Sequence, residues 1–228
     1  MTAPHPSPGR RPTRPTARLE RSLGHDGHGS VAGLDEVGRG AWAGPVSVGV
    51  VVFRPDRRPP TGLRDSKMLT EPRREELFPL ITRWCTSWSV GHAQPTECDE
   101  LGMTKALRLA ARRALDGLAT PPALVLMDGN HDYVTDPAPA APATEVSTPQ
   151  IRTIVRGDAT CISIAAASIV AKVTRDRLMR SLADSFPAFD FDRNKGYPSP
   201  AHRTALAGFG LTSLHRRSWS YVDDLAFR

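Results

Sequence analysis

The sequence is poor in cysteine and contains no long hydrophobic run. Cys85, Cys98 and Cys161 are its only cysteines, and their spacing matches neither a CxxC pair nor a set of metal ligands. A small, odd number of widely spaced cysteines argues against a disulfide framework and indicates a reducing compartment, so we expect a cytoplasmic protein. No apolar stretch approaches the roughly 20 residues of a transmembrane helix, and we therefore expect no membrane partner.

Acidic residues are nearly absent from the N-terminal region. Glu20 is the only acid before residue 22, whereas prolines and arginines alternate up to Arg18. This composition predicts that residues 1–30 form a disordered, basic Pro/Arg-rich tail. The region lacks the apolar core of a secretory signal, and its prolines argue against the amphipathic helix of an organellar transit peptide. Such a tail either adds nonspecific affinity for phosphates or has no function.

The composition as a whole is that of a globular protein. Hydrophobic residues make up 39% and charged residues 24% of the sequence. A chain of 228 residues is long enough to bury a sizeable core. The 30 Lys and Arg residues outnumber the 24 Asp and Glu residues, giving a formal net charge of +6. A positive charge fits a polyanionic partner, because Lys and Arg release counterions when they bind phosphates, but solubility alone also explains it.

Two adjacent carboxylates end the first predicted strand. Residues 31–34 are small and apolar, Asp35 and Glu36 follow, and after a Gly-Arg-Gly turn a second apolar strand spans residues 46–53. Ionised carboxylates at the end of a buried strand cost several kcal/mol to desolvate unless a cation or hydrogen-bond donors compensate them. Either a positive group meets this pair or the pair begins a solvated turn, and this segment alone leaves both interpretations open.

Strands and helices alternate along the rest of the chain, which predicts an α/β fold. Thr70 is a credible N-cap for a helix that Pro79 should kink or shorten. Residues 96–118 predict one amphipathic helix with a cationic face, which is more often solvated than bound to nucleic acid. Further strands are expected at 88–91, 123–129 and 150–155, and a long helix with a buried first half at 162–182.

Two segments depart from this alternation. Residues 131–149 are rich in Pro, Ala and Thr and predict a flexible, low-complexity loop. The C-terminal region contains a short helix that starts at Ser199 and a basic cluster at residues 215–217, and it predicts a small helical appendage. The expected organisation is a tail at 1–30, a main α/β domain at 31–185 and a helical segment at 186–228.

Three of the predicted strands are followed by carboxylates. In an α/β fold such groups can converge at one edge of the sheet, and oxygen ligands without His or Cys select hard cations such as Mg²⁺ or Mn²⁺. Two such ions about 3.5 to 4 Å apart activate water and stabilise the leaving oxygen in phosphodiester cleavage. A single Asp before Gly is more often a turn former, but the repetition favours a metal site. The candidate ligands are Asp35, Glu36, Asp128 and Asp158.

These carboxylates belong to an ordered set of motifs. The set comprises Asp35-Glu36-Val37-Gly38-Arg39-Gly40, Asp65-Ser66-Lys67, Met127-Asp128-Gly129, Gly157-Asp158, residues 166–177 and Gly196-Tyr197-Pro198. Each motif alone is weak, but their order and spacing are specific. Over roughly residues 31 to 220, the set resembles that of ribonuclease HII, the bacterial type 2 ribonuclease H.

The resemblance implies both a fold and an activity. The implied fold is a ribonuclease H-like mixed five-stranded sheet flanked by helices, with a C-terminal helical appendage. The implied activity is that of an endoribonuclease that hydrolyses the RNA strand of RNA/DNA hybrids and incises 5′ of ribonucleotides embedded in duplex DNA, for ribonucleotide excision repair. These nucleic acids are then the partners, and we expect the chain to act as a monomer.

The resemblance also assigns roles to residues. The family's metal-binding acids fall on the four candidate ligands, with Asp176 as the main rival of Asp158; an ion pair is the usual explanation for an acid flanked by two arginines. Tyr197 matches the tyrosine that packs on the sugar at the RNA-to-DNA junction, although it could instead be a loop aromatic packed on the core. The residues matched to substrate contacts are Gly38, Arg39 and Gly40, which read the 2′-OH, and Ser66 and Lys67, near the substrate backbone.

The sequence departs from the family pattern at one helix, and two other classes of protein remain. Gly102 and Leu107 replace the usual Asn and Thr, which affects helix stability and one polar contact rather than the metal site. A ribonuclease H-like DNA nuclease of the resolvase or transposase type is disfavoured because the Gly-Arg-Gly turn and Tyr197 serve 2′-OH detection. A catalytically silent hybrid-binding protein should have lost one of the four acids, and all four are present.

Overall fold

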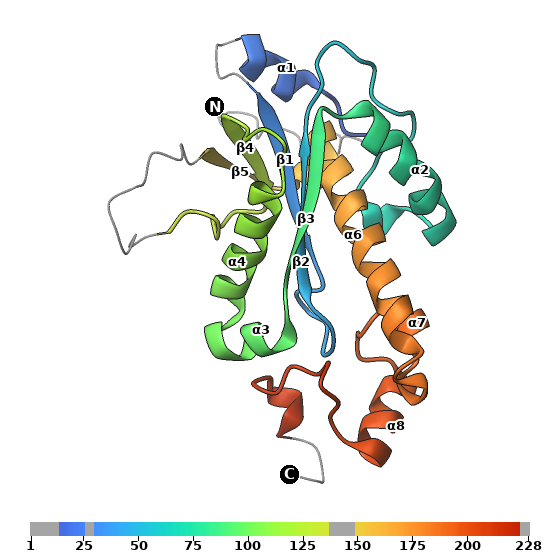
Figure 1. Cartoon of the computed structure of the whole chain (residues 1–228). Coiled ribbons are helices and arrows are strands. Elements are labelled where there is room, and N and C mark those ends of the chain that lie inside the picture. Colours follow the sequence, from blue (N-terminus) through green and yellow to red (C-terminus); the bar gives the residue numbers. More distant parts are fainter. Residues whose placement is uncertain (1–13, 26–29, 137–148, 224–228) are drawn as a thin grey trace, which may run out of the picture.

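A five-stranded sheet forms the centre of the molecule (Figure 1). The computed structural model describes residues 14–25, 30–136 and 149–223. The strand order is β3-β2-β1-β4-β5; the first three strands pair antiparallel, whereas β4 and β5 run parallel to β1. The strands are β1 (Val31–Val37), β2 (Val46–Val52), β3 (Ser87–Ala93), β4 (Leu124–Asp128) and β5 (Gln150–Ile154). The predicted mixed sheet is therefore confirmed.

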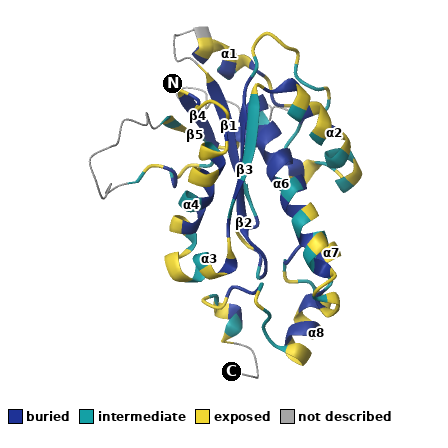
Figure 2. Ribbon diagram, viewed as in Figure 1, coloured by how far each residue is buried: buried dark blue, intermediate teal, exposed yellow. Residues whose placement is uncertain are grey.

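Helices cover both faces of the sheet, with α4 (Met103–Asp116) on one face and α6 (Ile162–Ala183) on the other (Figure 1). Residues of β2 alternate between the two faces, so that Val50 packs in the cluster with the α4 alanines and Val51 in the cluster with α6. A Cβ at Gly33 would lie 2.1 Å from the Ser163 carbonyl carbon, so glycine is required where α6 crosses β1. The helix α6 runs as predicted, and its first half is buried (Figure 2).

The remaining elements surround this core. They are α1 (Arg18–His25), η1 (Ser66–Met68), α2 (Glu71–Trp84), α3 (Pro95–Leu101), α5 (Gly157–Thr160), η2 (Pro187–Phe189), α7 (Phe191–Asn194), α8 (Pro200–Phe209) and η3 (Ser220–Val222). Within the described ranges, no helix combines the length and the apolar character that crossing a bilayer requires.

Two helix predictions need correction. The single helix expected at 96–118 is two helices, α3 and α4, because Gly102 between them has a φ of 73°, a left-handed value that no α-helix contains. Of the two effects expected of Pro79, a kink or a shorter helix, the shortening does not occur, because α2 continues past it to Trp84. Its residues on both sides of the proline, Leu77 and Ile81, are fully buried, and this packing offsets the one intrahelical hydrogen bond that proline removes.

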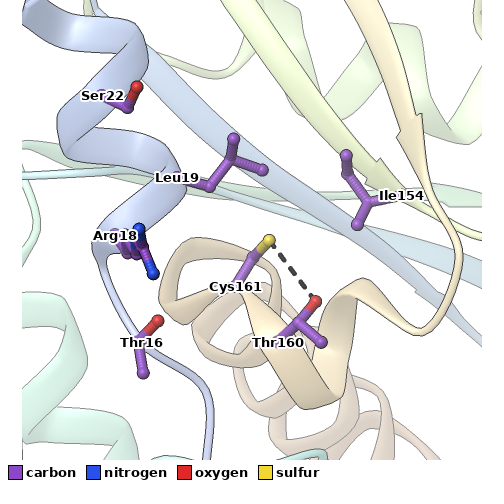
Figure 3. Close-up of a pocket in the computed structure, with 7 residues that line it drawn as sticks. All are labelled: Thr16, Arg18, Leu19, Ser22, Ile154, Thr160 and Cys161. Carbon is purple, nitrogen blue, oxygen red and sulfur yellow. Dashed lines mark hydrogen bonds between the residues drawn. The ribbon is translucent and has the colours of Figure 1, made fainter. Parts of the chain in front are cut away.

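The N-terminal region is not wholly the disordered tail that we predicted, because residues 18–25 form the helix α1. Beyond Pro15 the prolines stop, and Leu19 and Leu23 face one side of the helix. Leu23 is buried with Cys161, while Leu19 and Ile154 pack against the same cluster around a shallow hollow (Figure 3). Residues 1–13 and 26–29 lie outside the described residues.

The helix α1 also caps α6. The Oε1 atom of Glu20 accepts hydrogen bonds from the backbone N–H and the hydroxyl of Ser163, both at 2.8 Å. Ser163 lies in the first turn of α6, whose own N-cap residue, Cys161, makes no side-chain cap. A carboxylate from another helix therefore satisfies the first turn of α6, where backbone donors have no partner within the helix.

The C-terminal region packs as a separate small cluster at the far end of α6, and the predicted helical appendage is confirmed (Figure 2). Its buried residues include Phe189, Phe191 and Leu206, which share one hydrophobic cluster with Met179 of α6. Within the basic cluster at residues 215–217, His215 and Arg216 are buried and Arg217 is exposed. Of the loop predicted at 131–149, residues 137–148 lie outside the described residues.

Candidate active site

Three of the four predicted acids meet at one edge of the sheet. The parallel register pairs Leu34 with Met127, so Asp35 and Asp128, each one residue further along, lie side by side on neighbouring strands. Asp158 follows β5 in the short helix α5. Carboxylate oxygens of Asp35, Asp128 and Asp158 all lie within 4.8 Å of one another. Short hydrogen bonds hold two of them, since Asp128 Oδ1 accepts the Gly157 N–H at 2.7 Å and Asp35 Oδ1 accepts the Glu36 N–H at 2.8 Å.

The electrostatics of this group favour a bound cation. Burial, then the charges of Glu36 and Asp128, raises the pKa of Asp35 well above its usual range. Burial, then the charges of Asp128 and Asp65, raises the pKa of Asp158 to about 6. Ionising Asp35 and Asp158 therefore costs free energy that a positive ion would offset. An all-oxygen donor set of this size fits a hard divalent cation.

Lys67, which the resemblance places near the substrate backbone, is a cation that interacts electrostatically with the acids. Desolvation lowers the pKa of Lys67, but the charges of Asp35, Asp65 and Asp158 outweigh it and the net shift is upward. Its loop is built by Asp65, whose carboxylate accepts the Lys67 N–H at 2.9 Å. Ser66 is buried, and its hydroxyl accepts a hydrogen bond from Ser168 on α6 at 2.7 Å. Ser66 thus anchors the loop, and its contact with substrate stays a prediction.

Glu36 lies apart from the three aspartates. Neighbouring residues of a strand point to opposite faces, so Glu36 turns toward the face covered by α4 while Asp35 faces α6. The Tyr133 hydroxyl donates to Glu36 Oε2 at 3.2 Å, and Arg39 lies 3.9 Å from Oε1. Burial raises the pKa of Glu36, and this effect outweighs the lowering by the Tyr133 hydrogen bond and the Arg39 charge. The assignment of Glu36 as a ligand stays a prediction.

The Gly-Arg-Gly turn and Tyr197 lie together. Gly38 has a φ of 82°, and a Cβ there would lie 2.2 Å from the guanidinium of Arg175, so only glycine fits. A Cβ at Gly40 would lie 4.0 Å from the ring of Tyr197. Tyr197 is half-buried, and the guanidinium carbon of Arg175 lies 5.7 Å from its ring centroid. The turn, with Arg39 exposed, and the tyrosine ring thus form one continuous surface beyond the end of β1.

Comparisons with known proteins identify the family of this chain. The family model for ribonuclease HII matches residues 32–222. The ribonuclease HII of Streptomyces griseus is 51% identical over 215 residues, covering 92% of this chain and 86% of that protein. The ribonuclease HII of Paracoccus denitrificans is 45% identical over 211 residues, covering 92% and 94% of the two chains. The chain belongs to the ribonuclease HII family.

Solved structures give the same result. The crystal structure of ribonuclease H2 from Pyrococcus horikoshii matches with a TM-score of 0.69 at 27% identity, over 86% of this chain and 96% of that one. The RNase HII from Archaeoglobus fulgidus, solved in complex with PCNA, matches with a TM-score of 0.65 at 27% identity, over 84% and 95%. Ribonuclease HII membership and this structural likeness support a ribonuclease H nuclease that uses divalent metal.

Within this ribonuclease HII site, the rival acid Asp176 has a different environment. Lys172 Nζ lies 2.7 Å from Asp176 Oδ1 and Arg74 lies 3.8 Å from Oδ2. Asp176 is not a member of the group formed by the three aspartates. Asp176 thus forms ion pairs, as expected, but with Lys172 and Arg74 rather than with the flanking arginines.

Sequence reasoning missed the two buried arginines that support the Gly-Arg-Gly turn. Arg175 donates to the carbonyls of Pro45, Lys195 and Ala43, and Arg216 donates to those of Gly38, Arg39 and Gly44. Arg175 follows a run of small apolar residues in α6, which was the one available signal that its side chain enters the core. Arg216 lies between His215 and Arg217 in a basic cluster, and its sequence context carries no signal that it is buried.

Proposed function

We propose that this chain is an endoribonuclease that hydrolyses the RNA strand of RNA/DNA hybrids and incises duplex DNA 5′ of embedded ribonucleotides, as a step in ribonucleotide excision repair. The observation that carries the proposal is the group of three aspartates within 4.8 Å, one of which lies three residues before the Gly-Arg-Gly turn. A cation site beside a surface that can read a sugar is what hydrolysis at a ribonucleotide requires.

Asp35, Asp128 and Asp158 would hold Mg²⁺ or Mn²⁺, with Glu36 as the fourth ligand of a two-metal site. When bound, two such ions activate water and stabilise the leaving oxygen of a phosphodiester. The raised pKa values of Asp35 and Asp158 support this role, because groups that resist ionisation together gain most from a shared cation. The nearby carboxylates raise the pKa of Lys67 and so favour its charged form, which would meet a substrate phosphate.

Gly38, Arg39, Gly40 and Tyr197 would recognise the nucleotide that carries the 2′-OH. The exposed backbone of the turn can approach a sugar closely, since Gly40 has no side chain, and the half-buried Tyr197 ring offers a flat apolar surface to the same sugar. Ser66 would act near the substrate backbone by holding the Lys67 loop. We further propose that the chain acts as a monomer in the cytoplasm.

The alternatives differ in what they cleave. A ribonuclease H-like DNA nuclease would use the same carboxylates but would not need the turn and the tyrosine. A silent hybrid-binding protein would bind RNA/DNA without hydrolysis, and the complete set of acids argues against it.

The proposal is tested by incubating the purified protein with a DNA duplex that contains one ribonucleotide, with Mg²⁺, with Mn²⁺ and with a chelator. We expect cleavage on the 5′ side of the ribonucleotide with at least one of the metals and none with the chelator, read on a denaturing gel. An intact duplex with both metals would contradict the proposal.

A further inference from the structure

The C-terminal segment at residues 212–216 lies against the loop that joins β1 to β2. Ala43 and His215 form an antiparallel bridge, and the N–H of Arg216 donates to the Trp42 carbonyl at 2.9 Å. The segment is thereby fixed to the loop that carries the Gly-Arg-Gly turn, although the two are far apart in the sequence. Of its two buried residues, Arg216 contacts the turn directly, and His215 reaches Tyr197 through His202.

Arg216 orients the backbone of the turn. Its guanidinium donates to the Gly38 carbonyl at 2.7 Å and to the Arg39 carbonyl at 2.9 Å. In a planar trans peptide the N–H points opposite to the C=O, so these bonds direct the N–H groups of Arg39 and Gly40 away from Arg216 and toward the exposed side of the turn. Among the described residues, no carboxylate forms an ion pair with Arg216.

His215 reaches Tyr197 through a second histidine. The Thr212 N–H donates to His215 Nδ1 at 2.9 Å, so this nitrogen is an acceptor and the ring proton lies on Nε2. The Nε2 atoms of His215 and His202 are 2.9 Å apart, so the His202 Nε2 accepts and its proton lies on Nδ1. That Nδ1 lies 2.9 Å from the Tyr197 carbonyl oxygen, which can only accept. All three hydrogen bonds are satisfied when both imidazoles are neutral, with the proton of His215 on Nε2 and that of His202 on Nδ1.

The surroundings keep both rings neutral. His202 is 0% and His215 2% exposed, and the rings of Phe189 and Phe191 pack around both. Burial, then the charges of His202 and Arg217, lowers the pKa of His215 to about 3, and burial also lowers the pKa of His202. A proton added to either ring would set two N–H groups against each other and break the chain of hydrogen bonds.

We infer that His215 and Arg216 are positioning residues that hold the two parts of the substrate-reading surface in register. Arg216 holds the Gly-Arg-Gly turn, and His215, through the Nδ1–H of His202, holds the backbone of Tyr197. The inference rests on the proposed function, because it takes the turn and Tyr197 to be the groups that read the ribonucleotide. Since the two residues are adjacent, a shift of their segment would move both groups together, whereas loss of either contact would change the spacing between them.

The proton positions can be measured without altering the protein. In ¹⁵N NMR spectra of the parent protein at pH 7, we expect His202 to carry its proton on Nδ1 and His215 on Nε2, both rings being neutral. The opposite tautomer of either ring, or a protonated ring, would overturn the inference.

Kinetics test the positioning itself. In His215→Asn the shorter side chain can still accept the Thr212 N–H but no longer reaches His202. We expect kcat/KM to fall at least about tenfold more on the single-ribonucleotide duplex, which has one productive register, than on a long RNA/DNA hybrid, which has many. Because His215 acts through Tyr197, the same substitution should add little to the selective loss caused by Tyr197→Ala.

Controls separate this inference from the proposed function. Arg217→Gln removes an exposed charge beside His215 and Arg216. It should change kcat/KM by the same factor on both substrates. If the parent protein cleaves neither substrate, the proposed function is wrong. Only the positioning role is wrong if Tyr197→Ala lowers kcat/KM selectively on the single-ribonucleotide duplex but His215→Asn lowers it equally on both substrates. The same holds if the selective losses of the two substitutions add in full. Thermal unfolding checks each variant, and if His215→Asn does not fold, the ring tautomers of the parent decide.

Discussion

At the scale of single residues, the site depends on which face of β1 a side chain occupies. Asp35 and Glu36 are neighbours in sequence, yet Asp35 joins Asp128 and Asp158, while Glu36 accepts a hydrogen bond from Tyr133. The alternation of a strand places them on opposite faces. Asp35 therefore points to the α6 side, where it joins the other two aspartates, and Glu36 points to the α4 side.

The raised pKa of Asp35 gives a prediction for metal-free protein. Above that pKa the ionised carboxylate destabilises the folded state, because the unfolded chain ionises Asp35 more easily. In Asp35→Asn, the free energy of unfolding at pH 8 with a chelator should equal or exceed that of the parent, and the difference should shrink as the pH falls and the parent carboxyl takes up its proton. Activity should fall on the order of a hundredfold or more.

Denaturant unfolding and single-turnover kinetics measure both effects. Asp116→Asn, which changes an exposed carboxylate at the end of α4, should leave stability and activity as they are. Parental activity in Asp35→Asn would contradict the assignment of this residue as a ligand.

Residue patterns predicted the acids well and the buried cations poorly. Asp35, Asp128 and Asp158 each follow an apolar strand, and this local signal is enough to place them at the sheet edge. Arg216 is buried where it donates to carbonyls of the loop between β1 and β2, more than 150 positions earlier in the chain, and His215 is buried among Phe189, Phe191 and His202. Because these contacts are not local, the His-Arg-Arg sequence showed a basic cluster and carried no signal that two of its residues are buried.

At the scale of elements, α1 is part of the folded core. Its Glu20 carboxylate satisfies the first turn of α6, and Leu23 shares a buried cluster with Cys161 and Ile164. The many prolines of residues 1–30 predicted disorder for the whole region. The helix near its end has only eight residues, too few for its apolar periodicity to be recognised. The break at Gly102 was hidden for a related reason, since the apolar spacing continues across it.

Glu20→Ala should destabilise the protein by about 1 to 2 kcal/mol, because the Ser163 N–H and hydroxyl lose their buried acceptor. Urea unfolding measures this loss. Arg21→Ala, one residue along the same helix and exposed, is the matched control and should cost less than about 0.5 kcal/mol. Equal stability of Glu20→Ala and the parent would show that α6 does not need this cap.

At the scale of the whole molecule, the fold collects groups from three regions of the chain. The parallel strands β1, β4 and β5 end at one edge and bring the aspartates together, while the C-terminal segment returns to the loop after β1 and joins it to Tyr197. The α/β class and the sheet were predictable from alternating strands and helices and from the motif order. The contact between the C-terminal segment and the loop was not, because neither side carries a periodic pattern.

The central claim is that one surface both recognises a ribonucleotide and hydrolyses the phosphodiester beside it. It is tested most directly by competition in one reaction between two DNA duplexes of the same sequence, which differ only in a single 2′-OH, at a fixed Mg²⁺ or Mn²⁺ concentration. We expect cleavage of the ribonucleotide duplex on the 5′ side of that nucleotide while the all-DNA duplex stays intact. Cleavage of both duplexes at similar rates would contradict the claim and indicate a DNA nuclease.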